Sequence, residues 1–407
     1  MSHDLQPTDA FQARVLEGRA LAEAGDFRGA ERVFRGLLDE ARDSHAGNHA
    51  RALQSLITLY GRGGRYLEAH MLARRLADHA RTAGPAGDRV LAFALGAVCG
   101  ALSQLDLDEP LGRALVDLRA VLDRAAEPYT NLELEYHAAA GSHARSVGDF
   151  LRARDHATAY RRLIDQTEGL EQVFRWALVM GQAQLACDEG NYPLARHLAA
   201  EFGKGGQTPP FHRLKEVALA VAVHAALGER EEACAAAEEA IAILEAVEEQ
   251  SGLASGRIHE GSILARELEK VGEWKLAGRV YDLVAAAVMI RFRQLEACTR
   301  ELPELGIDDD DSRAVLARFR RQFVREQREL LRHVAGILEA RGDDYVQSLL
   351  DRSGPEGFVA ICAWCESVRP TEGSWLPIGH FVPREAGFQV THAICPPCAQ
   401  AMEASPA

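Results

Sequence analysis

Two closely spaced cysteine pairs near the C-terminus are the residues of this chain best suited to chemistry. Cys362 and Cys365 form the first pair, and 29 residues separate it from Cys395 and Cys398. A CxxC turn directs two sulfurs toward one point, and two such turns together make a tetrahedral site that suits Zn²⁺. The pattern therefore predicts a structural zinc site in which all four cysteines act as thiolates.

Two other interpretations of the cysteine pairs stay open. In the first, Cys362 and Cys365 are a redox dithiol, although such dithiols usually begin a helix in a βαβ setting and no βαβ pattern precedes them. In the second, the four are unligated thiols. The glycines and small apolar residues around the pairs favour the metal-site interpretation, because a domain this small usually needs a bound metal or a disulfide to fold.

The residues around the pairs resemble a small cysteine module at the C-termini of bacterial signalling proteins, among them response-regulator and PAS-domain proteins. Besides the cysteines, the positions that match are Arg369, Gly373, Trp375, His392, Ile394 and Pro396. The sequence departs from the module at Glu366-Ser367, where lysines are usual, and at Ala393, where glycine is usual. The resemblance covers about 45 residues and implies a signalling context, but no reaction.

A short sequence motif, called the phrase below, recurs along the chain before this tail. A glycine is followed by an acidic or polar residue, then usually by an aromatic residue, with an alanine three positions further on. The glycines are Gly25, Gly64, Gly148, Gly190, Gly228 and Gly272. They are 39, 84, 42, 38 and 44 residues apart, and the interval of 84 spans a degenerate copy near Leu107 to Ala114. The period is therefore about 41 residues over seven units.

The phrase has a direct physical meaning. Glycine permits a tight turn between two antiparallel helices, and a small alanine lets the helices approach closely. Each helix pair leaves an apolar face that only its neighbours can cover, so successive pairs should stack. The phrase, clearest from Leu21 to Ala30, resembles the tetratricopeptide repeat in its longer variant. That resemblance implies a superhelix with a concave groove for peptides or partner helices. A rigid spacer or a dimerisation platform is the other interpretation.

Residues 312–352 are predicted to form a long connecting helix. The run from Leu302 through Pro303 should break the last repeat helix, and the acidic residues before Ser312 suit a helix N-terminus. An apolar seam follows at Leu316, Phe319, Phe323, Leu330, Val334 and Ile337. This seam favours a coiled coil joining two protomers, and a helix that caps the last repeat is the alternative. The helix is also rich in arginine, which we expect to pair with the acidic array.

Length, composition and charge limit the fold class, the kinds of partner and the cellular compartment that can be expected. The chain has 407 residues, a net charge of −14 and only 6% aromatic residues, which favours helices and disfavours non-specific nucleic-acid binding. No apolar run approaches the roughly 20 residues of a membrane span. Because Met1 to Gly18 is polar, without a secretory signal, we expect a reducing cytoplasm, with Cys99, Cys187, Cys234 and Cys298 as buried thiols. The acidic array favours basic partner segments, or is merely solubilising.

Motifs for common catalytic chemistries are not found in the sequence. There is no GxxxxGK[ST] loop, no GxGxxG after a strand and no HExxH. His137, His143 and His156 fall in a helical repeat without a partner at suitable spacing, so we interpret them as packing or surface residues. The sequence therefore predicts a protein that acts by binding and is not an enzyme.

These observations predict an all-α chain in three parts. A tetratricopeptide-like superhelix of about seven helix pairs spans 10–303, the connector helix spans 312–352, and a small zinc-ribbon-like module with four cysteine ligands spans 357–402. The function predicted is that of a cytoplasmic bacterial signalling adaptor that binds partner proteins through the superhelix. One alternative is a thiol-based redox sensor or oxidoreductase. Another is a zinc-ribbon DNA-binding regulator, which the negative net charge of the tail disfavours.

Overall fold

The computed structural model describes most of the chain before residue 322 and three short strands beyond it. The described residues are 9–41, 46–105, 107–125, 128–170, 172–201, 210–246, 254–305, 307, 310, 312–321, 358–362, 368–370 and 389–393. Most of the predicted connector helix, and the predicted four-cysteine module apart from its strands, therefore lie outside the described residues.

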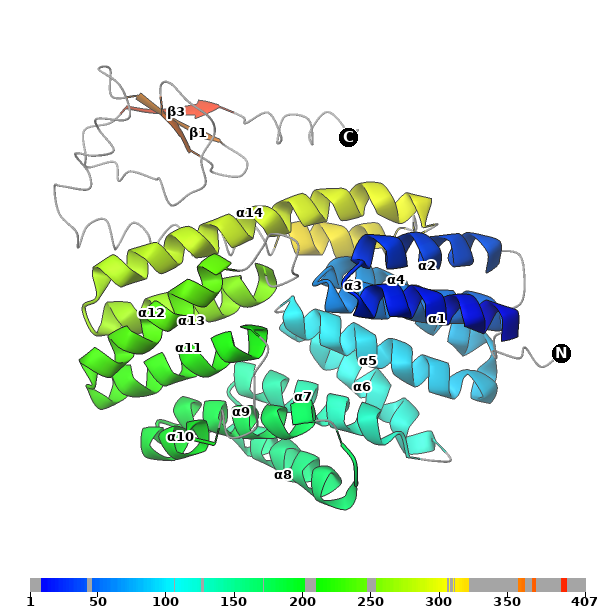
Figure 1. Cartoon of the computed structure of the whole chain (residues 1–407), viewed down its shortest axis with the longest axis horizontal. Coiled ribbons are helices and arrows are strands. Elements are labelled where there is room, and N and C mark those ends of the chain that lie inside the picture. The colour runs from blue at the N-terminus through cyan, green and yellow to red at the C-terminus, as the bar shows by residue number, and fades with distance from the viewer. Residues whose placement is uncertain are drawn as a thin grey trace. The chain divides into compact units, whose positions relative to one another are not determined.

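Seven consecutive helix pairs make up the described array (Figure 1). They are α1 (Asp9–Glu23) with α2 (Phe27–Ala41), α3 (Ala46–Arg62) with α4 (Tyr66–Thr82), α5 (Asp88–Gln104) with α6 (Asp108–Arg124), α7 (Thr130–Ser146) with α8 (Phe150–Gln166), α9 (Gln172–Asp188) with α10 (Tyr192–Ala199), α11 (Pro210–Leu227) with α12 (Arg230–Ala246), and α13 (Ala254–Lys270) with α14 (Trp274–Glu304). A short 3₁₀ helix, η1 (Gly84–Gly87), joins α4 to α5. The prediction of a helical chain built from packed helix pairs is confirmed, and this arrangement is compatible with a helical-repeat protein.

The six repeat glycines terminate the first helix of their pairs in the left-handed conformation. Their φ angles lie between 69° and 85°. At Gly148 the backbone N–H donates to the carbonyl of Arg145 at 2.9 Å, and the N–H of Asp149 donates to the carbonyl of Ala144 at 2.8 Å. These two bonds form a Schellman motif, which satisfies carbonyls that the helix end would leave unpaired. The corresponding pair of bonds recurs at all six glycine turns.

The polar residue after the glycine caps the second helix in three of the repeats. The side-chain oxygen of Asp26 accepts a hydrogen bond from the N–H of Gly29 at 2.8 Å. Asp149 accepts one from Arg152, and Asn191 accepts one from Leu194. Such N-caps satisfy one of the first four N–H groups of a helix, which explains why Asp or Asn follows the glycine here.

The repeat alanines lie where neighbouring helices meet. All six are buried, namely Ala30, Ala69, Ala153, Ala195, Ala233 and Ala277. Ala153 of α8 packs in one cluster with Ala144 of α7 and Leu185 of α9, and Phe150 lies partly buried against it. A larger side chain at Ala153 would push these helices apart, so the small residue follows from close helix packing.

The degenerate copy, the pair of α5 and α6, keeps the helix-pair geometry with different residues. The N–H of Leu107 donates to the carbonyl of Leu102 at 3.0 Å, the same bond that closes the glycine turns. Buried Leu111 stands where the other copies have alanine. Pro110 lies in the first turn of α6, where its missing N–H costs no helical bond.

The packing contacts divide the chain into two compact units. The first comprises 1–212, 248–255 and 297–312, and the second comprises 213–247, 256–296 and 313–407. Fully buried residues of the first unit include Leu37, Leu56, Leu72, Leu118 and Leu134. In the second unit a separate buried cluster includes Val221, Ile241, Leu268 and Tyr281. Each unit therefore has a hydrophobic core of its own.

The last repeat helix, α14, ends at Glu304, with Pro303 in its final turn. Residues 312–321 are helical, and the rest of the predicted connector, 322–352, lies outside the described residues. The segment 297–312, which includes the end of α14, belongs to the first unit, whereas the beginning of α14 belongs to the second. Nothing in the sequence pattern had indicated that the chain returns to the first unit at this point.

Three short strands in the C-terminal region form one sheet in the order β2-β1-β3. They are β1 (Phe358–Cys362), β2 (Val368–Pro370) and β3 (Gln389–Ala393). β1 is antiparallel to β2 and parallel to β3, and Cys362 lies opposite Ala393 in the parallel pair. The ends of β1 and β3 therefore lie at the same edge of the sheet.

One stretch of the described chain, Gly84–Gln104, is long and apolar enough to cross a membrane by length and composition alone. The sequence interpretation had not singled it out. More than half of its most apolar window is buried within the protein. Core helices of helical-repeat proteins pass the same test, so this stretch is weak support for a membrane span.

Candidate functional site

The predicted metal site can be followed in the structure only through its backbone. Cys362 is the last residue of β1, whereas Cys365, Cys395 and Cys398 lie outside the described residues. In the sequence, Cys395 follows the end of β3 by two residues. Because β1 and β3 are parallel neighbours, each CxxC motif follows or overlaps a strand that ends at the same edge of the sheet. Among the described side chains, no group of three or more His, Cys, Asp or Glu residues is placed to hold a metal ion.

The four remaining cysteines are not equally buried. Cys99 and Cys298 are buried, as predicted, but Cys187 and Cys234 are half-buried. Burial raises the pKa of the Cys99 thiol to about 12, because a thiolate is poorly solvated among apolar helices. Cys99 is therefore a protonated and unreactive thiol at neutral pH.

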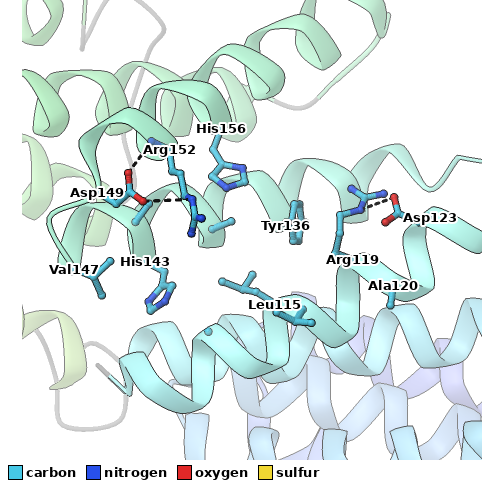
Figure 2. A pocket seen from close by; sticks show the side chains of 14 residues that line it. Leu115, Arg119, Ala120, Asp123, Tyr136, His143, Val147, Asp149, Arg152 and His156 are labelled. Atoms are coloured by element: carbon cyan, nitrogen blue, oxygen red, sulfur yellow. Dashed lines mark hydrogen bonds and ion pairs between the residues drawn. The ribbon is translucent and has the colours of Figure 1, made fainter.

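A groove of about 480 Å³ lies between α6, α7 and α8, within the first unit. Its lining residues are Gly112, Leu115, Val116, Arg119, Ala120, Asp123, Tyr136, Ala140, His143, Ala144, Val147, Asp149, Arg152 and His156. Figure 2 shows the Asp149–Arg152 pair at one end of the groove and the Arg119–Asp123 pair at the other, with Tyr136 and His156 between them. The groove therefore combines an apolar lining with charged ends.

Two aliphatic side chains of the groove are largely exposed to solvent. Val116 of α6 is 70% exposed, and Val147, in the turn between α7 and α8, is 59% exposed. Exposed aliphatic side chains are ordinary when they are scattered, but these two belong to one concave site. Covering them with a ligand would remove apolar surface from water, which stabilises a complex by about 25 cal/mol per Å².

The two arginines of the groove differ in how firmly they are held. Arg119 donates two hydrogen bonds to Glu133, at 2.6 and 2.9 Å, and a third to Asp123 at 2.8 Å. The side chain of Arg152 is 77% exposed and pairs with the carboxylate of Asp149 at 3.3 Å. An exposed pair of this kind contributes about 0–1 kcal/mol. Arg152 can therefore turn to a carboxylate of a ligand at little cost, whereas Arg119 is a fixed part of the wall.

His156, which lines the groove, contacts His137. The Nδ1 atoms of His137 and His156 lie 3.0 Å apart, and Tyr136 makes an edge contact with both rings. Burial, and then the neighbouring His156, lower the pKa of His137 to about 4, and burial lowers the pKa of His156. Both rings are therefore neutral at pH 7, and one Nδ1–H donates to the other Nδ1.

The third histidine, His143, lines the same groove from α7. Its Nδ1 lies 3.5 Å from a carboxylate oxygen of Asp108, too far for a strong hydrogen bond. The sequence interpretation of the three histidines as packing or surface residues did not indicate that His143 and His156 line one groove, or that His137 contacts His156. Their spacing of six and 13 residues along the chain gave no sign of it, since the contact depends on how α7 packs on α8.

This arrangement is suited to binding. An apolar floor, two exposed valines, a weakly paired arginine and neutral imidazoles provide both apolar contact and hydrogen bonds, which is the usual make-up of a ligand site. No protein-family model matches this chain, and no curated protein matches it at a significant level.

Proposed function

We propose that this protein is a scaffold of the tetratricopeptide-repeat type that binds partner proteins through its helix pairs. Supporting this are the six left-handed glycine turns and the buried alanine that follows each of them. These features match the residues on which the resemblance to that repeat rests. Stacked helix pairs present extended surfaces for peptides and partner helices, and such surfaces are how solenoid proteins generally act.

The groove between α6, α7 and α8 is our candidate for the partner-binding surface. The single observation that carries this is the pair of exposed valines, Val116 and Val147, in a concave site of about 480 Å³. The partner segment would place an aliphatic side chain against them and a polar or acidic group near Arg152. The negative net charge of the chain favours partners that carry basic residues elsewhere along the bound segment.

The first experiment is a selection of linear peptides from a displayed random library against the full chain. Enriched peptides would then be labelled, and their affinity measured by fluorescence anisotropy for the wild type and two variants. Val116→Asp puts a charge into the groove and should weaken binding about tenfold or more, since a buried unpaired charge costs well over about 1.4 kcal/mol. Leu194→Asp changes an exposed aliphatic residue on α10, outside the groove, and should leave affinity unchanged.

Two outcomes would count against the groove. If no peptide is enriched, the site does not take linear segments. If Val116→Asp and Leu194→Asp bind selected peptides as tightly as the wild type, the peptides bind elsewhere on the array. Circular dichroism of each variant establishes that the helices remain folded.

The tail is proposed to be a small module stapled by structural Zn²⁺ on Cys362, Cys365, Cys395 and Cys398. The parallel pairing of β1 with β3 supports this, because each CxxC motif follows or overlaps a strand ending at one edge of the sheet. When bound, the ion would hold a sheet too small to be stable alone. The thiol-based redox sensor and the zinc-ribbon DNA-binding regulator are the alternatives for this module.

Together these parts suggest a cytoplasmic bacterial signalling adaptor and not an enzyme. The array would bind a partner, and the tail would be a second interaction module, consistent with its resemblance to modules of bacterial signalling proteins. The connector over 312–352 would join two protomers as a coiled coil or cap the last repeat. Size-exclusion chromatography with light scattering distinguishes these two roles of the connector.

A further inference from the structure

Two histidines of neighbouring helices face each other through nitrogen atoms of the kind that bind metal ions. His137 lies on α7 and His156 on α8. Their Nδ1 atoms are 3.0 Å apart, and the two ring planes are inclined at 50°. His156 also lines the groove between α6, α7 and α8. The pair of nitrogens therefore lies beside an open space of the protein.

The pair is held in place by packing, yet it is not sealed from solvent. Tyr136 makes edge contacts with both rings, at centroid distances of 5.1 Å to His137 and 5.8 Å to His156. Both histidines are half-buried. A binding site needs donor atoms whose rings are fixed by their surroundings and which a ligand can reach. The two imidazoles meet both conditions.

Both imidazoles are neutral at neutral pH, which is the form that binds a metal ion. Burial, and then the charge of His156, lowers the pKa of His137 to about 4, and burial lowers the pKa of His156. In the hydrogen bond between them, one ring carries its proton on Nδ1. When both Nδ1 atoms bind an ion, that proton is on Nε2 of the same ring, so the tautomer changes and no proton is released.

The distance between the two nitrogens favours a particular kind of ion. Bonds from a metal to a histidine nitrogen are about 2.0–2.1 Å long, so two nitrogens 3.0 Å apart subtend an angle of about 95° at an ion bonded to both. Neighbouring ligands in square-planar and octahedral complexes make about 90°, whereas the tetrahedral geometry of structural zinc needs about 109°. Imidazole ligands in a tetragonal arrangement are typical of Cu²⁺ and Ni²⁺, and Cu²⁺ is bound more strongly.

The charges around the pair leave room for a cation. Arg119 acts on His137, and Arg152 acts on His156, and each lowers the pKa of that imidazole. Both arginines are paired with carboxylates, however. The partners are Glu133 and Asp123 for Arg119, and Asp149 for Arg152. Because carboxylates outnumber guanidiniums in this set, the local charge does not exclude a divalent ion.

We propose that His137 and His156 form a two-imidazole site for a divalent transition-metal ion, with Cu²⁺ the preferred one. Among the described side chains, no third His, Cys, Asp or Glu completes the site. The other coordination positions are therefore left to water or to a donor atom of a bound partner. The site differs from the zinc site proposed for the tail, whose ligands are thiolates. It also stands whether or not the groove binds a peptide.

Electron paramagnetic resonance of bound Cu²⁺ tests this site in the full-length chain. The four tail cysteines are changed to serine, and His3→Gln is added, because thiolates and a histidine near the N-terminal amine also bind Cu²⁺. Substoichiometric Cu²⁺ is then added to this background chain at neutral pH. Pulsed spectra should show two imidazole ligands on each ion. Competition with a chelator of known affinity gives the dissociation constant.

Three single substitutions in the background chain locate the ligands. His137→Gln and His156→Gln should each weaken Cu²⁺ binding about tenfold or more and leave at most one imidazole on the ion, because the second ligand then no longer binds intramolecularly. His197→Gln, at an exposed position of α10, should change neither the spectrum nor the dissociation constant. Circular dichroism establishes that each variant is folded.

The background chain alone can overturn the proposal, even if a variant does not fold. A spectrum with one imidazole or none means that the two histidines only hydrogen-bond across the helix pair. An unchanged dissociation constant in His137→Gln or in His156→Gln leads to the same conclusion, because the ion is then held elsewhere.

Discussion

At the scale of single residues, His70 shows what burial does to a polar side chain within the array. It lies on α4, is 4% exposed, and its Nδ1 has no hydrogen-bond partner in the described structure. Burial, with a smaller contribution from the charge of Arg74, lowers the pKa of His70 to about 3. The imidazole must therefore stay neutral for the helices to pack.

The lowered pKa predicts a loss of stability on acidification. The unfolded chain binds a proton at His70 below about pH 6.5, whereas the folded chain binds it only near pH 3. Folding therefore becomes less favourable as the pH falls through this window, with a limiting slope of about 1.4 kcal/mol per pH unit from this group. Urea unfolding at pH 7 and pH 5 measures the change.

Substituting the histidine tests whether it is the source of this loss. His70→Leu should unfold at a more similar urea concentration at pH 7 and pH 5 than the wild type does. His197→Gln, at an exposed position of α10, should retain the wild-type difference. An unchanged pH dependence in His70→Leu would show that other groups, such as His137, account for the effect.

At the scale of secondary-structure elements, the glycine turn is what makes each helix pair. Gly148 has φ of +78°, and a Cβ added there would meet no atom within 4 Å. The requirement for glycine at this position is therefore conformational and not steric, because an L-residue in the left-handed region costs about 1–2 kcal/mol. The same conformation recurs at the other repeat turns.

Two glycine-to-alanine substitutions distinguish this requirement from a general effect of glycine. Gly148→Ala should lower the free energy of unfolding by about 1–2 kcal/mol. Gly181→Ala, within helix α9 and also in open space, should raise it by about 0.5–1 kcal/mol, because alanine is the better helix former. Chemical denaturation followed by circular dichroism gives both values, and equal effects of the two changes would contradict the turn argument.

At the scale of the whole molecule, we propose that the array and the tail rely on different sources of stability. The helix pairs bury continuous apolar cores in each of the two compact units. The described sheet of the tail has three strands of three to five residues, which offers little apolar surface to bury. Small domains of this kind usually depend on a metal or disulfides.

Removal of metal should therefore affect the tail alone. We expect about one zinc per chain by atomic emission spectroscopy, with about four thiols becoming titratable on chelation. Changing all four cysteines of the tail to serine should abolish zinc binding and make the tail protease-sensitive, while the thermal transition of the helices stays unchanged. Metal-free protein in which Cys362 and Cys365 oxidise reversibly would favour the redox alternative, and salt-dependent binding to duplex DNA would favour the regulator.

Much of the fold could be predicted from the sequence because the repeat is encoded locally. Glycine, capping residue and alanine occur within six positions of one another, and each acts on the turn in which it lies. Even the degenerate copy was located, although Leu111 replaces the alanine there. The pairing of the C-terminal strands in one sheet, in the order β2-β1-β3, was not predicted, because no local sequence pattern shows which strands pair.

The residues of the candidate site could be predicted from the sequence less well than the fold could, because tertiary packing brings them together. The sequence by itself determined a repeat of helix pairs, because local turn chemistry and apolar periodicity suffice to specify it. Only the packing of α7 on α8 decided that His137 would face His156, and only the return of α14 decided that Glu301 would meet Arg35, 266 residues away. Contacts of this kind arise when elements pack together, and their energies depend on burial that no local pattern records.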